Sequence, residues 1–208
     1  GFSIVSWTAN GQIATLGHGL GQVPSLIICK KRSTDGDPWI TLADGFSSDE
    51  YILLNTSGAK AAASGFWGST PNSTTFSVTG NGFAAGTAIA YCFANTEMVQ
   101  VGSYVGNGLD DGPFISLPFK PAFILWKNID VAGFSWGMQD NKRDGYNPAN
   151  WQLYASDAVA ESTGYHMADL LSNGVKINGD GGATNNGAGN EILYLAISEQ
   201  PFKHSRGR

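Results

Sequence analysis

The chain contains the segment Gly17-His18-Gly19-Leu20-Gly21-Gln22-Val23-Pro24-Ser25-Leu26-Ile27-Ile28-Cys29-Lys30, in which a glycine-rich turn leads through a proline into an apolar run. A similar pattern returns as Leu117-Pro118-Phe119-Lys120-Pro121-Ala122-Phe123-Ile124-Leu125-Trp126-Lys127, with Leu20 matching Leu117 at a shift of 97 positions. An apolar run bounded by Gly and Pro predicts a short strand, and its return predicts two copies of one structural unit. A residue that both copies retain is therefore expected to belong to the scaffold, whereas a residue present in one copy can serve a function.

The repetition extends over most of the chain. Further matching pairs are Ser6–Gly11 with Ser103–Gly108, Trp39 with Trp136, Tyr51 with Trp151, and Ala90–Ala94 with Tyr194–Ser198. We therefore predict two domains, residues 1–98 and 99–202, followed by a short basic tail over residues 203–208. The junction over residues 95–100 contains neither Pro nor Gly, so we expect the two units to pack together rather than to hang on a flexible linker.

Each repeat contains seven short β-branched or aromatic runs that are separated by Gly, Asn, Asp or Pro. They cover residues 2–8, 12–16, 25–31, 39–42, 51–54, 75–78 and 87–94, and then 101–105, 114–117, 122–127, 134–138, 151–154, 175–177 and 191–198. Short strands at this spacing predict an all-β protein of two tandem antiparallel β-sandwich or jelly-roll-like units. Helix signals are confined to Ala59–Ala63 and Ala155–Glu161, each long enough for one or two turns.

Composition and charge exclude several classes of function. Charged residues make up only 14% of the chain, there are 28 glycines, and the net charge is −5. Without a basic stripe we expect no nucleic-acid partner, and without a run of roughly 20 apolar residues we expect no membrane insertion. Low charge suits surfaces that are buried against sister subunits. The start inside an apparent strand at residues 1–5 suggests a longer parent protein.

No pattern of catalytic or metal-binding residues stands out. The chain has five glutamates, and none lies in the alternating Glu-x-Asp-x-Glu pattern of sandwich-fold glucanases, although acids from distant loops could still combine. No His-x-His or Cys-x-x-Cys indicates zinc. The turns Asp35–Asp37 and Asp110–Gly112 could supply calcium ligands, but Asp-Gly is also a common turn dipeptide. We predict no catalytic residues, no metal and no cofactor.

Two polar segments of the second repeat are candidates for recognition. Residues 140–150 form a longer segment than residues 44–50 opposite them, and loops on a rigid scaffold commonly carry binding sites. The candidate contact residues are Asn141, Lys142, Arg143, Asp144, Tyr146 and Asn147. The alternative is an ordinary solvated loop. The Asn- and Gly-rich residues 178–190 are predicted to form a flexible hairpin loop that is displayed beside it.

Several motifs resemble those of an uncharacterised family of tandem-repeat domains from tailed-phage virion proteins, notably tail fibres. The motifs are Gly17-His18-Gly19-Leu20-Gly21-x-x-Pro24, Gly102-Ser103-Tyr104-x-Gly106-Asn107-Gly108, Asp111-Gly112-Pro113-Phe114, Ala90–Ala94 and Ser198–Phe202. The resemblance implies a non-enzymatic structural protein with a lectin-like sandwich, located in the virion and in contact with other virion proteins. By analogy with fibres it also implies a symmetric homo-oligomer, with a trimer expected.

The expected function is contact with the host surface as part of a tail fibre or tail tip, with a cell-surface glycan or protein as receptor. On this hypothesis, deleting residues 141–149 would spare folding and abolish adsorption. The alternatives are a carbohydrate-binding module, a glycan-cleaving enzyme, and a capsid decoration protein without a receptor.

Overall fold

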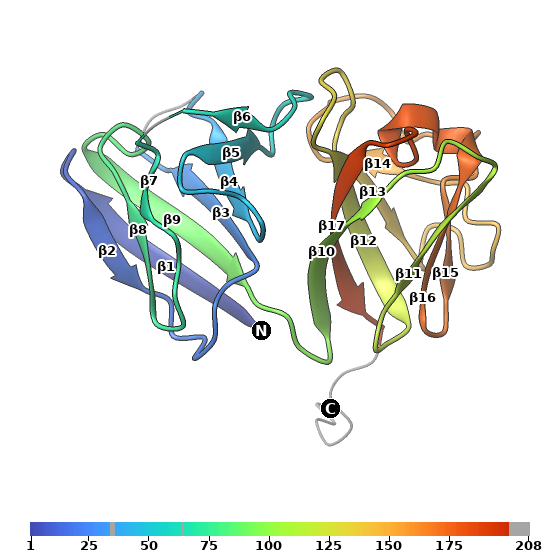
Figure 1. Cartoon of the computed structure of the whole chain (residues 1–208), viewed down its shortest axis with the longest axis horizontal. Coiled ribbons are helices and arrows are strands. Elements are labelled where there is room, and N and C mark those ends of the chain that lie inside the picture. Colours follow the sequence, from blue (N-terminus) through green and yellow to red (C-terminus); the bar gives the residue numbers. More distant parts are fainter. Residues whose placement is uncertain (34–35, 64, 200–208) are drawn as a thin grey trace. The chain divides into compact units, whose positions relative to one another are not determined.

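A computed structural model describes residues 1–33, 36–63 and 65–199 (Figure 1). These residues form antiparallel strands and no α-helix, which confirms the predicted all-β class. Contacts divide the chain into two compact units. Unit 1 contains residues 1–55 and 60–95, and unit 2 contains residues 56–59 and the chain from residue 96 onward. Unit 1 thus ends close to the predicted boundary at residue 98, and the tail over residues 203–208 lies outside the described residues.

Unit 1 consists of a six-stranded and a three-stranded antiparallel sheet. In order across the sheet, the larger one contains β1 (Phe2–Ala9), β9 (Gly86–Phe93), β3 (Leu26–Lys31), β4 (Trp39–Ala43), β5 (Glu50–Leu53) and β6 (Ala61–Ala62). The smaller one contains β2 (Ala14–Gly17), β8 (Thr75–Val78) and β7 (Trp67–Ser69). Strands that are distant in sequence therefore lie side by side, with β9 between β1 and β3.

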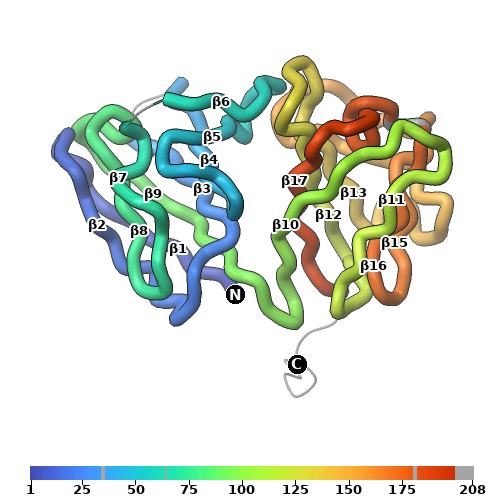
Figure 2. The backbone as a smooth tube through the Cα atoms, viewed as in Figure 1, coloured from blue at the N-terminus to red at the C-terminus, as the bar shows by residue number. Residues whose placement is uncertain are grey.

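Unit 2 repeats this strand order. Its larger sheet contains β10 (Val99–Val105), β17 (Glu191–Ser198), β12 (Pro121–Asn128), β13 (Gly137–Asp140) and β14 (Leu153–Tyr154). Its smaller sheet contains β11 (Asp111–Ser116), β16 (Gly174–Asn178) and β15 (Ala168–Leu171), and a 3₁₀ helix, η1 (Gly179–Thr184), follows β16. The tube in Figure 2 follows the same path through each unit. The register of the strand pairs agrees as well. Leu26 lies opposite Ala43, and the residues 97 positions later, Phe123 and Asp140, also lie opposite each other.

In each unit the two sheets share one hydrophobic core. In unit 1, Ile27 and Cys92 of the larger sheet pack in one cluster with Phe76 and Val78 of the smaller sheet. In unit 2, residues of β12 such as Ile124 and Trp126 share a cluster with Val175 and Ile177 of β16. Full burial of such a side chain stabilises a fold by about 1.5–3 kcal/mol. Each core therefore holds its two sheets as a support for the loops.

The two predicted helical turns are wrong. Ala61–Ala62 forms β6 and pairs with Glu50 and Tyr51, and residues 155–161 form a turn followed by a segment without regular secondary structure. One or two turns of helix are unstable alone, whereas the edge of a sheet offers backbone partners. The strands β7 and β15, which complete the smaller sheets, were not among the predicted runs. That the two repeats pack together stays a prediction.

The described residues include no helix that is long and apolar enough to cross a membrane.

Candidate functional site

The segment between β13 and β14 starts from a tight turn at Asp140. One carboxylate oxygen of Asp140, Oδ1, accepts the backbone N–H groups of Lys142 and Arg143, both at 2.9 Å, and Oδ2 accepts Arg143 Nε at 2.6 Å. Although partial burial raises the pKa of Asp140, these donors outweigh it and hold that pKa below its usual value. Arg143 also forms an ion pair with Glu161 at 3.0 Å. The side chain of Arg143 therefore serves to fix the loop.

The far end of the loop is fastened to β15. Asn147 Nδ2 donates to the carbonyl oxygen of Leu170 at 3.0 Å, and Asn147 Oδ1 accepts the Leu170 N–H at 3.2 Å. The side-chain amide thus takes the place of a neighbouring strand. Ala149 is buried, and its carbonyl accepts Gln139 Nε2 at 2.7 Å. Because the loop contributes buried groups, the expectation that residues 141–149 can be deleted without loss of folding conflicts with this packing.

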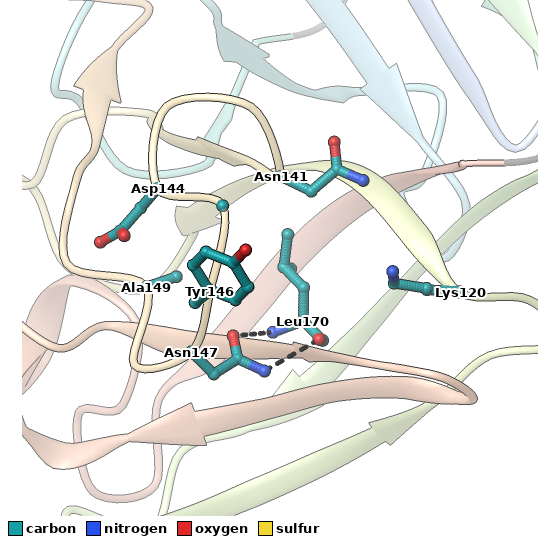
Figure 3. A pocket seen from close by; sticks show the side chains of 8 residues that line it. Lys120, Asn141, Asp144, Tyr146, Asn147, Ala149 and Leu170 are labelled. Atoms are coloured by element: carbon teal, nitrogen blue, oxygen red, sulfur yellow. Dashed lines mark hydrogen bonds between the residues drawn. The ribbon is translucent and has the colours of Figure 1, made fainter.

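Between these anchors the loop borders a pocket of about 230 Å³ that is open to solvent (Figure 3). The residues that line it are Lys120, Asn141, Asp144, Gly145, Tyr146, Asn147, Ala149 and Leu170. Figure 3 shows the Tyr146 ring close to Leu170, with Asp144 and Lys120 on opposite sides. Leu170 is 7% exposed, whereas Tyr146 is 88% exposed. The pocket therefore combines a buried apolar residue with an aromatic ring that contributes little to the core.

Two polar side chains that line the pocket, Lys120 and Asn141, are held by Glu199. Lys120 Nζ lies 2.8 Å from Glu199 Oε2, and Asn141 Nδ2 donates to Glu199 Oε1 at 2.9 Å. The hydrogen bond from Lys120 lowers the pKa of Glu199 below its ordinary value. On the opposite side, Asp144 Oδ2 accepts the Asn150 N–H at 2.9 Å. This hydrogen bond holds the Asp144 side chain against the loop, and Figure 3 shows its carboxylate directed away from Tyr146 and Leu170.

Unit 1 has a pocket at the equivalent place, and it is much smaller. Its volume is about 50 Å³, and its lining includes Val23, Pro24, Asp44, Phe46 and Pro71. At the common shift of 97 positions, Val23 corresponds to Lys120 and Asp44 to Asn141. The loop there covers only residues 44–49, between β4 and β5. The larger, polar pocket is therefore a property of the longer loop in unit 2.

Four of the six predicted contact residues line the pocket: Asn141, Asp144, Tyr146 and Asn147. The other two, Lys142 and Arg143, do not. The sequence reasoning missed Lys120 and Leu170, although the exchange of Val23 for Lys120 between the repeats was a visible signal for the first.

The predicted flexible loop over residues 178–190 is wrong in its central part. Its start forms η1, and Asn185 and Asn186 are buried. Asn186 Nδ2 donates to the Leu109 carbonyl at 2.7 Å, and Asn186 Oδ1 accepts the Asn107 N–H at 2.9 Å. These contacts fasten the segment to the unit, so it is not a freely displayed loop.

The acidic turns do not form a metal site in the described part of the chain, where no group of three or more His, Cys, Asp or Glu side chains could hold a metal ion. Asp111 forms an ion pair with Lys176. Asp35, of the other predicted turn, lies outside the described residues.

A family profile described as a domain of unknown function (DUF7483) matches residues 1–201. The chain belongs to the DUF7483 family. Since the match includes both units, the DUF7483 domain comprises the two repeats together. No curated protein and no solved structure matches the DUF7483 chain.

Proposed function

We propose that this DUF7483 chain is a non-enzymatic structural protein of a tailed-phage virion, in a tail fibre or tail tip, and that unit 2 contributes to recognition of the host surface. The observation that carries the proposal is the anchored pocket beside Tyr146, built by a loop that is longer than its counterpart in unit 1. The placement in a virion rests on the motifs at Gly17–Pro24 and Gly102–Gly108, which resemble those of phage tandem-repeat domains.

The chemistry of the pocket favours binding over catalysis. Hydrolysis of a glycosidic bond commonly needs two carboxylates that flank the bond. Asp144 is the only carboxylate among the lining residues. The neighbouring Glu199 is already bound by Lys120 and Asn141. A recognition site requires no second acid, and a fixed loop with an exposed aromatic residue is a suitable contact surface.

The proposal is tested by two measurements. Mass spectrometry of particles purified from the bacterium that carries the gene should detect the chain as a particle component. The purified chain should compete with those particles for adsorption to host cells, and Tyr146→Ala should abolish the competition. Tyr165→Ala is the matched control, because Tyr165 is also an exposed tyrosine of unit 2 but does not line the pocket. Absence from the particles, or equal competition by both variants, would overturn the proposal.

A carbohydrate-binding module outside any particle is the second candidate, because the same pocket favours it. It predicts a saturable sugar affinity together with absence of the chain from purified particles. The third possibility, a capsid decoration protein, is tested by immunogold labelling of particles. Label on the capsid rather than on the tail would indicate it.

A further inference from the structure

We infer that the pocket of unit 2 binds one uncharged sugar ring, which lies against Tyr146, and that the equivalent place in unit 1 does not bind it. The inference deepens the proposed function and rests on it, because it names the chemical class of the receptor.

The size and shape of the pocket select a small, flat ligand. Its volume of about 230 Å³ is below the roughly 300–1,000 Å³ of sites for drug-sized molecules. An aromatic ring offers a flat apolar face, and tyrosine adds a polar edge. A sugar ring presents a matching face of C–H groups with hydroxyls around its rim. Tyr146 is 88% exposed at the pocket, so its face is accessible to such a partner.

Charge at the pocket disfavours an acidic ligand. The cation of Lys120 lies 2.8 Å from Glu199, so most of its attraction for an anion is already compensated. The side chains in and around the loop include three cations against four carboxylates: Lys120, Lys142 and Arg143 against Asp140, Asp144, Glu161 and Glu199. This balance of charge favours an uncharged ligand over an acidic one.

The internal repeat supplies a comparison within one chain. The equivalent pocket of unit 1 is about 50 Å³, and it has Val23 in place of Lys120 and Phe46 within its short loop. It is too small for a sugar ring that fills the pocket of unit 2. The place in unit 1 that corresponds to the site is therefore not expected to bind the sugar.

The test is a titration of the ¹⁵N-labelled full chain, followed by NMR, with methyl glycosides of neutral hexoses and with the corresponding hexuronates. A neutral glycoside should produce saturable shifts of the amides at residues 144–147 and none at residues 43–46. Tyr146→Ala should weaken binding by about tenfold or more, whereas Tyr165→Ala should leave the affinity unchanged. Dispersed spectra of each variant establish that it is folded.

The inference is overturned if no neutral glycoside shifts residues 144–147, if a hexuronate binds more tightly, or if the unit 1 pocket responds equally. Its failure is distinct from failure of the proposed function. Tyr146-dependent adsorption without sugar binding would leave host recognition intact and indicate a protein receptor. Sugar binding by a chain that is absent from particles would instead support the sugar site and contradict the proposed virion function.

Discussion

At the scale of single residues, His18 shows how the glycine-rich turn is fixed. The ring is buried, with Nε2 3.0 Å from the Asn72 carbonyl oxygen, and Nδ1 accepts the Leu20 N–H at 3.2 Å. These partners assign the ring hydrogen to Nε2. His18→Ala leaves the Leu20 N–H and the Asn72 carbonyl without their partner, so we expect it to lower the free energy of unfolding by about 1–3 kcal/mol.

Urea unfolding measures this change. The control is Gln12→Ala at an exposed position of the neighbouring turn, which should stay within about 0.5 kcal/mol of the unmodified chain. Equal stability of the two variants would contradict the structural role of His18.

The two thiols of unit 1 give a second prediction for single residues. Cys29 and Cys92 are free and buried in one core. Burial raises the pKa of both thiols, that of Cys92 to about 12, and the neighbouring Cys92 raises that of Cys29 further. Because the thiolate is the reactive form, a thiol reagent at pH 8 should label neither cysteine in the folded chain and both after unfolding. Rapid labelling of the folded chain would contradict the burial, and no labelling after unfolding would indicate a disulfide.

The same pKa shifts determine how the free energy of unfolding changes with pH. The unfolded thiols ionise near pH 8.5, below their pKa in the fold, so the unfolded state loses protons first. The contribution of the thiols to stability is therefore complete below about pH 8.5 and is lost as the pH rises.

At the scale of elements, one amide fastens the loop between β13 and β14 to β15. Asn147 makes two hydrogen bonds to the backbone of Leu170. Asn147→Ala should speed hydrogen exchange at the Leu170 N–H by about five- to tenfold, since a net hydrogen bond contributes about 1 kcal/mol. Lys142→Ala changes an exposed residue of the same loop and should leave that rate unchanged. An unaffected rate in Asn147→Ala would show that the loop is held by its other contacts.

The elements also show how far sequence reasoning extends. The strands Thr75–Val78 and Glu191–Ser198 have the predicted bounds, because β-branched and aromatic residues mark a half-buried sheet locally. The strand Trp67–Ser69 was missed because it is short and contains a glycine. The burial of Asn186 could not be predicted from its neighbours, since its partner Leu109 is far away in the chain. The pairing of Asn147 with Leu170 was hidden for the same reason.

At the scale of the whole molecule, the equal strand order of the two units separates scaffold from function. Apart from the extra edge strand β6 of unit 1, both units have the same strand order, and β3–β4 and β12–β13 have the same register, so these sheets form the common scaffold. The units differ in the loop that follows β4 in one and β13 in the other, and unit 2 also has η1. A longer loop on a common sheet alters the surface while the strand order is kept, which explains why the pocket of unit 2 is larger than that of unit 1.

The edge of unit 1 predicts association between chains. The eight-residue strand β1 lies at the end of its sheet, where Phe2 is 50% and Ile4 is 56% exposed. An apolar strand on a sheet edge is prone to pair with another chain. Light scattering should therefore give a multiple of the chain mass of 21.9 kDa, and the proposed place in a tail fibre favours three copies.

Ile4→Lys should shift this assembly toward the monomer, because a charge on an edge strand opposes pairing. Ile13→Lys is the matched control, since Ile13 is 70% exposed but lies between strands. A monomer mass for the unmodified chain would contradict assembly, and equal loss of assembly in both variants would show that β1 is not the contact. If Ile13→Lys keeps the assembly and Ile4→Lys loses it, the β1 edge of unit 1 mediates assembly. The loop of unit 2 then remains available for the host surface.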